Sequence, residues 1–194
     1  MFRVMRYFII LALSLFWAAC AYRFGYGDRS LPGGHQKVAI PVFENQTSLV
    51  GAETYFTNAI IREFVRSKVA EVTSKDQSQA VIEGIITEIA YKPVAQKKGG
   101  DSEDRVTQLP SDTVLTTEYR IEVSATVRLR QKSDNQIIWQ GGFKKEKTYS
   151  APQIGLEVVN TANPLYNHSA RHENIRLMAK DMMAEAYGRM TENF

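Results

Sequence analysis

The chain has 194 residues, of which 44% are hydrophobic and 23% charged, as in ordinary globular proteins. This length predicts one domain that can form a hydrophobic core without metals, and the single cysteine excludes an intramolecular disulfide. The net charge of +3 falls to +1 when Arg3 and Arg6 are removed with the expected leader, so the global charge gives no indication of nucleic-acid binding.

The first 19 residues have the features of an export signal. Arg3 and Arg6 precede an apolar run from Tyr7 to Trp17 that is interrupted only by Ser14. The run is shorter than the roughly 20 apolar residues that a membrane span requires. Ala18 and Ala19 are small residues of the kind that a leader peptidase needs before its cleavage site. We therefore expect residues 1–19 to be removed.

The cysteine directly after this leader indicates a lipid anchor. Ala18-Ala19-Cys20 resembles the lipobox of bacterial lipoproteins, which implies acylation of the Cys20 thiol and cleavage before it. Two or three acyl chains hold a protein stably on a membrane without a spanning helix. Ala21, in place of Asp, resembles the sorting signal for the outer membrane. The alternatives are an ordinary signal peptide with a chance cysteine and an uncleaved anchor.

The mature chain begins with a tether and a strand–helix unit. Residues 20–36 are rich in glycine and aromatic residues and predict a lipidated tether that leads into a single domain over residues 37–194. Lys37–Phe43 predicts a strand, with Pro41 near its end or on a sheet edge. Residues 51–68 predict an amphipathic helix, and Val69–Thr73 predicts a short strand. The helix would bury a stripe formed by Phe56, Ala59, Ile60 and Phe64.

The rest of the chain predicts three strands and a second helix. Ala80–Tyr91 is apolar on both faces, which favours a central strand. A long charged loop is expected over 92–112. Glu118–Arg130 alternates polar and apolar residues, as expected for a half-buried strand, and a turn at 132–136 leads to its partner, Ile137–Tyr149. Gly141 and Gly142 predict a bulge or a close backbone approach in that partner.

The last predicted element is an amphipathic helix over about 169–190. Its apolar stripe consists of Ile175, Met178, Ala179, Met182, Ala186 and Met190. The methionines could instead form an adaptable binding surface, but a core stripe is the simpler interpretation. The element order predicts an α+β fold, with a mostly antiparallel sheet of four to five strands and two helices packed on one face.

Five cations on the last two predicted strands form a candidate anion-binding patch. Arg128 and Arg130 precede the turn at 132–136, and Lys144, Lys145 and Lys147 follow it. Guanidinium groups bind phosphate in a bidentate way, whereas ammonium groups act as point charges. The patch could therefore bind the phosphates or core sugars of lipopolysaccharide. The alternative is a solvated strand whose lysines prevent edge-to-edge pairing.

Catalytic signatures are missing from the sequence. HExxH, GxSxG, CxxC and P-loop patterns are all absent, so we expect no enzyme and no cofactor. His168 and His172 are spaced i, i+4, which could present two imidazoles to a metal ion. Because the sequence indicates no third ligand, we interpret them as two exposed histidines in a first helical turn and expect no metal site.

Several stretches resemble the lipopolysaccharide-assembly lipoprotein family, LptE. They are Cys20–Phe24, then Leu31-Pro32 leading to Val38–Thr47, then Gly51-Ala52-Glu53 opening a helix, and Ala80–Ile86 before the paired strands. The resemblance covers nearly all of the mature chain. It implies an outer-membrane lipoprotein of a Gram-negative envelope that sits in the lumen of the large LptD β-barrel. Such a protein would help that barrel assemble, plug it, and bind lipopolysaccharide during transport to the outer leaflet.

A second family remains open on the same residues. Val38–Thr47 followed by a helix also resembles the opening of periplasmic regulatory lipoproteins, such as activators of peptidoglycan synthases and curli-type secretion lipoproteins. The two interpretations differ in the expected partner. The first predicts a large outer-membrane barrel, and the second predicts a cell-wall synthase or a secretion component.

Overall fold

The computed structural model describes residues 29–98, 114–150 and 164–192, which form one six-stranded mixed sheet covered by two long helices. The elements in chain order are η1 (Pro32–Gly34), β1 (Lys37–Ala39), β2 (Glu44–Asn45), α2 (Ala52–Ser67), β3 (Glu71–Val72), β4 (Ala80–Lys98), β5 (Val114–Gln131), β6 (Ile137–Ser150) and α3 (Pro164–Thr191). The fold is α+β, as predicted. In the described part of the chain, no helix is both long and apolar enough to cross a bilayer.

The sheet has the order β3-β1-β4-β5-β6, with β2 also paired to β4. The three long strands are antiparallel, whereas β1 pairs in parallel with β3 and β4, and β2 pairs in parallel with β4. The prediction of a mostly antiparallel sheet with four to five strands is therefore only partly right. β1 and β3 fall within the predicted strands Lys37–Phe43 and Val69–Thr73, but the separate β2 and the parallel pairing of these short strands were not predicted, because a two- or three-residue strand carries almost no periodicity.

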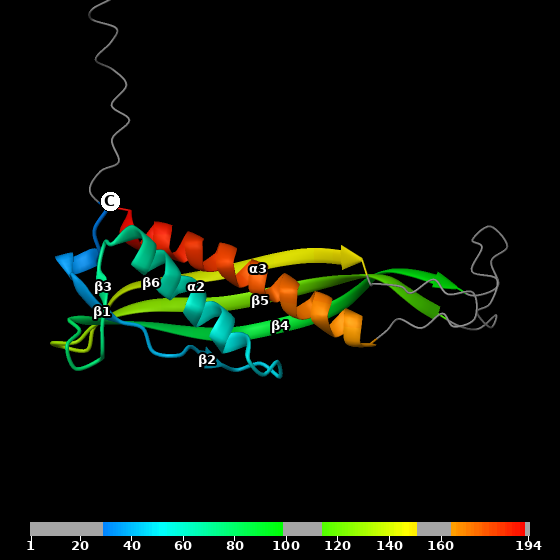
Figure 1. The fold of residues 1–194 in the computed structure, drawn as a ribbon, viewed down its shortest axis with the longest axis horizontal. Helices are drawn as coiled ribbons and strands as arrows, with labels where there is room; N and C mark the ends of the chain where they lie inside the picture. The colour runs from blue at the N-terminus through cyan, green and yellow to red at the C-terminus, as the bar shows by residue number, and fades with distance from the viewer. Residues whose placement is uncertain (1–28, 99–113, 151–163, 193–194) are drawn as a thin grey trace, which may run out of the picture.

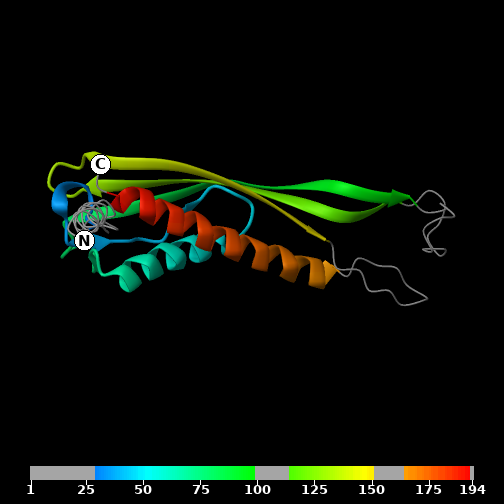
Figure 2. The ribbon, with the colours of Figure 1, turned by 90° about the horizontal axis from the view of Figure 1, so that it is seen from above.

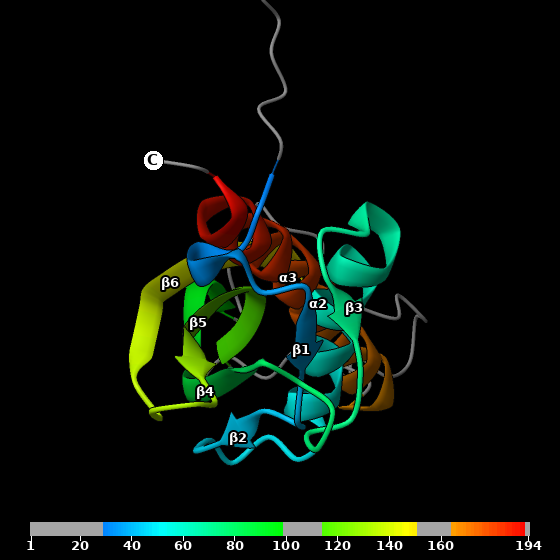
Figure 3. The same cartoon turned by 90° about the vertical axis from the view of Figure 1, so that its left-hand side faces the viewer.

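Both helices lie on one face of this sheet, as Figures 2 and 3 show. In α2, Ala52, Phe56, Ile60 and Phe64 recur every fourth residue, and all four are buried. In α3, the stripe predicted from the sequence is buried throughout, together with Met183 and Tyr187. The methionines of α3 therefore belong to the core. Phe64 of α2 meets Tyr187 of α3 edge to face, with ring centroids 5.1 Å apart.

The predicted first strand is split in two. β1 ends at Ala39, and β2 begins only at Glu44. Pro41 lies between them and cannot donate to a strand ladder. Phe43 is 3% exposed, and its backbone N–H donates to the Thr57 hydroxyl of α2 at 3.0 Å. A Cβ added to Gly84 of β4 would lie only 2.0 Å from the Phe43 ring, so this ring packs where β4 has no side chain.

A side-chain network joins β2 to the start of α2. Asn45 Nδ2 donates to the Leu49 carbonyl and to Glu53 Oε2, each at 2.7 Å. Asn45 Oδ1 accepts from the Thr47 backbone N–H and hydroxyl, at 3.0 and 2.7 Å. The helix then starts after Gly51, whose φ of +90° favours glycine and whose N–H donates to Glu53 Oε1. Within this junction, the residues that carry part of the sequence resemblance therefore have a structural role.

β4 and β5 are longer than predicted. The expected loop over 92–112 is strand from 92 to 98, and residues 99–113 lie outside the described part. Beyond Ile86, β4 is paired only with β5 among the described residues, so its other edge is open. An edge strand tolerates Pro93, and the β4–β5 register shifts directly beside this proline. In Figure 1 these two strands continue as a ribbon past the end of β6.

The predicted bulge at Gly141 and Gly142 does not occur. The irregularity in the β5–β6 ladder lies between Leu129 and Arg130 instead. A Cβ at Gly141 would lie 2.8 Å from the Trp139 ring and 3.0 Å from the Phe143 ring, whereas one at Gly142 would meet nothing within 4 Å. Gly141 therefore makes room for side chains on its own strand.

Candidate functional site

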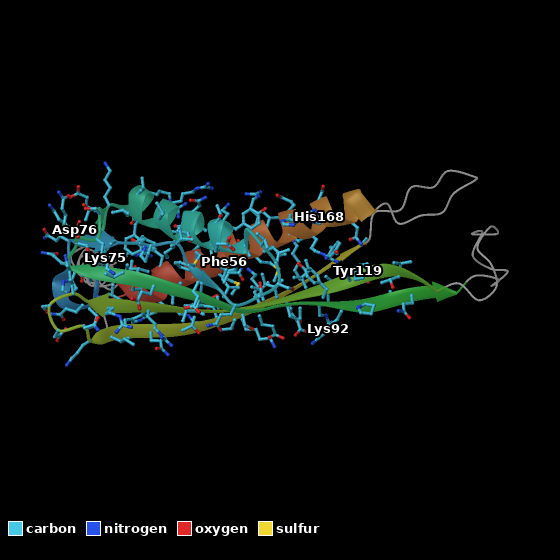
Figure 4. The ribbon with its side chains drawn as sticks, turned by 90° about the horizontal axis from the view of Figure 1, so that it is seen from below. Phe56, Lys75, Asp76, Lys92, Tyr119 and His168 are labelled. Atoms are coloured by element: carbon cyan, nitrogen blue, oxygen red, sulfur yellow. The ribbon has the colours of Figure 1, made fainter. Side chains whose placement is uncertain are left out.

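The alternation of β5 gives the sheet a helix-facing side and an open side. Its odd-numbered residues are in the core under the helices: Ile121, Val123, Ala125, Val127 and Leu129. The even-numbered residues from Arg120 to Arg130 point to the opposite side. We call that surface of β4, β5 and β6 the open face. Figure 4 shows Lys92 on the open face and Tyr119 on the side of the helices.

The structure divides the five predicted cations between the two sides of the sheet. Arg128, Arg130 and Lys144 belong to the open face, because Lys144 pairs with Ser124. Lys145 and Lys147 pair with Val123 and Ile121 and therefore lie on the helix-facing side. Successive residues of a strand point in opposite directions, so the three lysines cannot act as one patch.

Glu122 holds two ammonium groups together on the open face. Lys92 Nζ donates to Glu122 Oε1 at 2.8 Å, and Lys144 Nζ lies 3.7 Å from Glu122 Oε2. The carboxylate side chain is 11% exposed, whereas Lys92 and Lys144 are 58% and 65% exposed. The hydrogen bond from Lys92 and the charges of Lys92 and Lys144 lower the pKa of Glu122. Lys92 was missed because its position fell in a predicted loop.

The two arginines lie further along the same face and differ in their partners. Arg130 Nε donates to both oxygens of Glu83, at 3.1 and 3.3 Å, and Nη2 donates to Oε2 at 3.1 Å. Its Nη1 donates to the Asn135 carbonyl at 2.9 Å, so this guanidinium is occupied. Among the described residues, Arg128 Nε is buried without a hydrogen-bond partner.

Carboxylates accompany the cations across the open face. Glu83, Glu88, Glu122 and Glu146 lie between the basic residues, so the surface is mixed and not uniformly basic. Lys92 and Lys144 nevertheless present exposed N–H donors that a buried carboxylate fixes in place. An anionic, hydroxyl-rich ligand could replace water at these donors while the carboxylates accept from its hydroxyls.

The other two predicted lysines border α3. Lys145 Nζ donates to Asp181 Oδ2 at 2.6 Å. The pKa of Glu173 is lowered by its hydrogen bond from Arg176 and further by the charge of Lys147. Lys145 therefore forms an ion pair between β6 and α3, and Lys147 lies near enough to Glu173 for its charge to act on that carboxylate.

The two histidines of α3 form a separate polar cluster with α2. His168 Nε2 and His172 Nε2 are 3.1 Å apart, and the Tyr55 hydroxyl lies 3.2 Å from His172 Nδ1. Burial lowers the pKa of His172, as do the positive charges of His168 and Arg171. In the described ranges, no group of three or more His, Cys, Asp or Glu side chains is arranged to hold a metal ion. Cys20 lies outside the described residues.

The chain is similar in structure to several bacterial proteins of known structure. The PelC dodecamer from Paraburkholderia phytofirmans is 13% identical and superposes with a TM-score of 0.50, over 87% of this chain and 96% of that chain. Lipoprotein B from Nitrosomonas europaea is 14% identical, with a TM-score of 0.47 over 88% and 90%. A minor lipoprotein from Acinetobacter baumannii is 8% identical, with a TM-score of 0.42 over 80% and 90%.

The sequence itself identifies the family. No curated protein sequence matches the chain. The family model described as "LptE: Lipopolysaccharide-assembly" matches residues 36–190, from the residue before β1 almost to the end of α3. This range covers most of the chain, and it includes the β2–α2 junction and all three long strands. The chain therefore belongs to the LptE family of lipopolysaccharide-assembly proteins.

Proposed function

We propose that this protein is a lipopolysaccharide-assembly lipoprotein that is anchored in the outer membrane through acylated Cys20 and binds an LptD-type β-barrel. The observation that carries the proposal is the family match over residues 36–190. The family is one of non-enzymatic lipoproteins of the Gram-negative envelope. The leader before Cys20, the lipobox and Ala21 support the proposed anchor.

The shape and polarity of the sheet support a partner of barrel type. The open face consists of alternating charged and hydroxyl side chains, among them Arg120, Glu122, Ser124 and Thr126. The lumen of an outer-membrane barrel is also polar and is lined by alternating residues. A plug that presents a hydrogen-bonding sheet face to such a wall can pair donors with acceptors without burying unpaired charges.

We further propose that the open face binds lipopolysaccharide. Arg128, Arg130 and Lys144 supply the cations predicted from the sequence, and Lys92 adds another. Lys92 and Lys144 are positioned for phosphate because they converge on Glu122 and remain exposed. Lys145 and Lys147 lie on the other side of the sheet and serve as the natural comparison.

Neutralising the open-face lysines should therefore weaken lipopolysaccharide binding. The change is the double variant Lys92→Gln with Lys144→Gln, and its matched control is Lys145→Gln with Lys147→Gln, which removes the same charge from the other side. We expect the first variant to lose about ten-fold or more in affinity, since each charge-assisted contact contributes about 1 kcal/mol. The control should stay within about two-fold.

The affinity is measured by displacement of fluorescent lipopolysaccharide from the detergent-extracted lipoprotein. Chemical denaturation of both variants verifies that they are folded. Equal losses in the two variants would mean that binding follows total charge and not the open face. A loss confined to the Lys145 and Lys147 variant would place the ligand on the helix-facing side.

A further inference from the structure

The two imidazoles of α3 are arranged as a pair of metal ligands. His168 and His172 are one helical turn apart, and their Nε2 atoms approach to 3.1 Å with ring centroids 4.3 Å apart. When two imidazole nitrogens bind one ion, each at about 2.0–2.1 Å, the nitrogens lie about 2.9–3.4 Å apart. This interval corresponds to N–metal–N angles from the square-planar to the tetrahedral value. The observed separation falls in that interval without any movement of the helix.

The contact from α2 fixes the orientation that ligation requires. The Tyr55 hydroxyl lies 3.2 Å from His172 Nδ1, the ring nitrogen that does not contact His168. When His172 carries its proton on Nδ1, it donates to the Tyr55 oxygen, and its Nε2 lone pair is directed at His168. Metal-binding histidines almost always use their second ring nitrogen in this way, and the outer partner sets the tautomer.

Two arginines of α3 lie on the same helix as the pair and are engaged with other groups, although the charge of Arg171 still acts on His172. The guanidinium carbon of Arg171 lies 3.9 Å from the centroid of the Tyr91 ring. Arg176 donates to Glu173 through Nε and Nη2, at 2.7 and 2.6 Å. Neither guanidinium is therefore positioned between the two imidazoles, where it would repel a bound ion.

We propose that His168 and His172 bind one divalent transition-metal ion of the Cu²⁺, Ni²⁺ or Zn²⁺ class. Imidazole nitrogen favours these ions over Mg²⁺ and Ca²⁺, which prefer oxygen ligands. Without the ion, His168 Nε2–H donates to His172 Nε2. Binding the ion requires the neutral His168 to carry its proton on Nδ1 instead, so that its Nε2 lone pair is free for the metal. Since the described residues offer no group of three or more His, Cys, Asp or Glu ligands, water or a further ligand atom completes the coordination.

The test is a calorimetric titration of the full-length lipoprotein in detergent with Cu²⁺ and with Zn²⁺, which measures the affinity and the number of ions bound. Electron paramagnetic resonance of the Cu²⁺ complex then reports the nitrogen ligands. We expect one ion per chain and a signal from two imidazole nitrogens. His168→Ala and His172→Ala should each lower the affinity by at least about ten-fold, and Tyr55→Phe should lower it by about ten-fold. His35→Ala, which removes the third histidine of the chain, should leave the affinity unchanged.

The exposed position of His168 keeps the test decisive, because its replacement does not disturb the core. Circular dichroism of each variant confirms the helix. Unaltered affinity in His168→Ala, absence of binding by the unsubstituted protein, or a Cu²⁺ signal from a single nitrogen would each overturn the proposal. None of these three outcomes bears on lipopolysaccharide binding, since the open face is on the other side of the sheet.

Discussion

Replacing Gly84 with valine should destabilise the protein by about 3 kcal/mol or more, the upper end of the cost of overpacking a core. A side chain at this position would overlap the Phe43 ring, because even a Cβ would be 2.0 Å from it. Phe43 cannot easily move away, since its N–H is bonded to Thr57 and its ring is 3% exposed. The measurement is the free energy of unfolding in denaturant.

A double-mutant cycle identifies the cause of this loss. Gly84→Ala should cost far less in a Phe43→Ala background than alone, because the clashing ring has been removed. Gly142→Ala is the matched control, since a Cβ there meets nothing within 4 Å and the change should be close to neutral. Equal costs of Gly84→Ala in both backgrounds would show that packing of Phe43 is not the reason for the glycine.

Replacing Asn45 with alanine should cost about 2–3 kcal/mol. The change removes two donated and two accepted hydrogen bonds in a partly buried junction, and each such bond contributes about 1 kcal/mol. Gln46→Ala is the control, because Gln46 is exposed and, among the described residues, its side chain donates to Glu44 alone. If both variants unfolded at the same denaturant concentration, the junction would not stabilise the fold.

The same variant should also alter the acid sensitivity of the protein. The pKa of Glu53 is lowered by hydrogen bonds from the backbone and from the Asn45 amide. A carboxyl whose pKa is lowered on folding stabilises the folded state above its unfolded pKa, near 4.5, and this contribution disappears as the pH falls through the folded value. Asn45→Ala should raise the pKa of Glu53 and so flatten this part of the stability profile.

The two helices could be predicted from the sequence because their stripes are long. Phe56, Ile60 and Phe64 repeat every fourth residue, and the methionines of α3 extend the same pattern over several turns. Pro41 indicated an end to the first strand, but the return of the chain to the sheet as β2 could not be predicted, because there Phe43 packs against Gly84, 41 positions apart in the numbering. Such tertiary contacts override local strand propensity.

The candidate site shows the same limit. The alternation of β5 correctly separated its apolar and polar faces, but the lysines of β6 were grouped by their proximity in sequence. Lys144 and Lys145 point to opposite sides, and only the β5–β6 register decides which of them joins Arg128. Lys92 could have been found only by continuing β4 through Pro93, which the presence of proline in the strand disfavours.

The central claim is that this lipoprotein acts as the partner of an outer-membrane barrel, and one measurement tests it most directly. The native protein is extracted from its own membrane in mild detergent, purified, and the proteins that accompany it are identified and quantified by mass spectrometry. We predict a large β-barrel of the LptD type in equal amount with the acylated chain. Recovery of a cell-wall synthase in its place, or of the chain alone with an unmodified Cys20 thiol, would contradict the account.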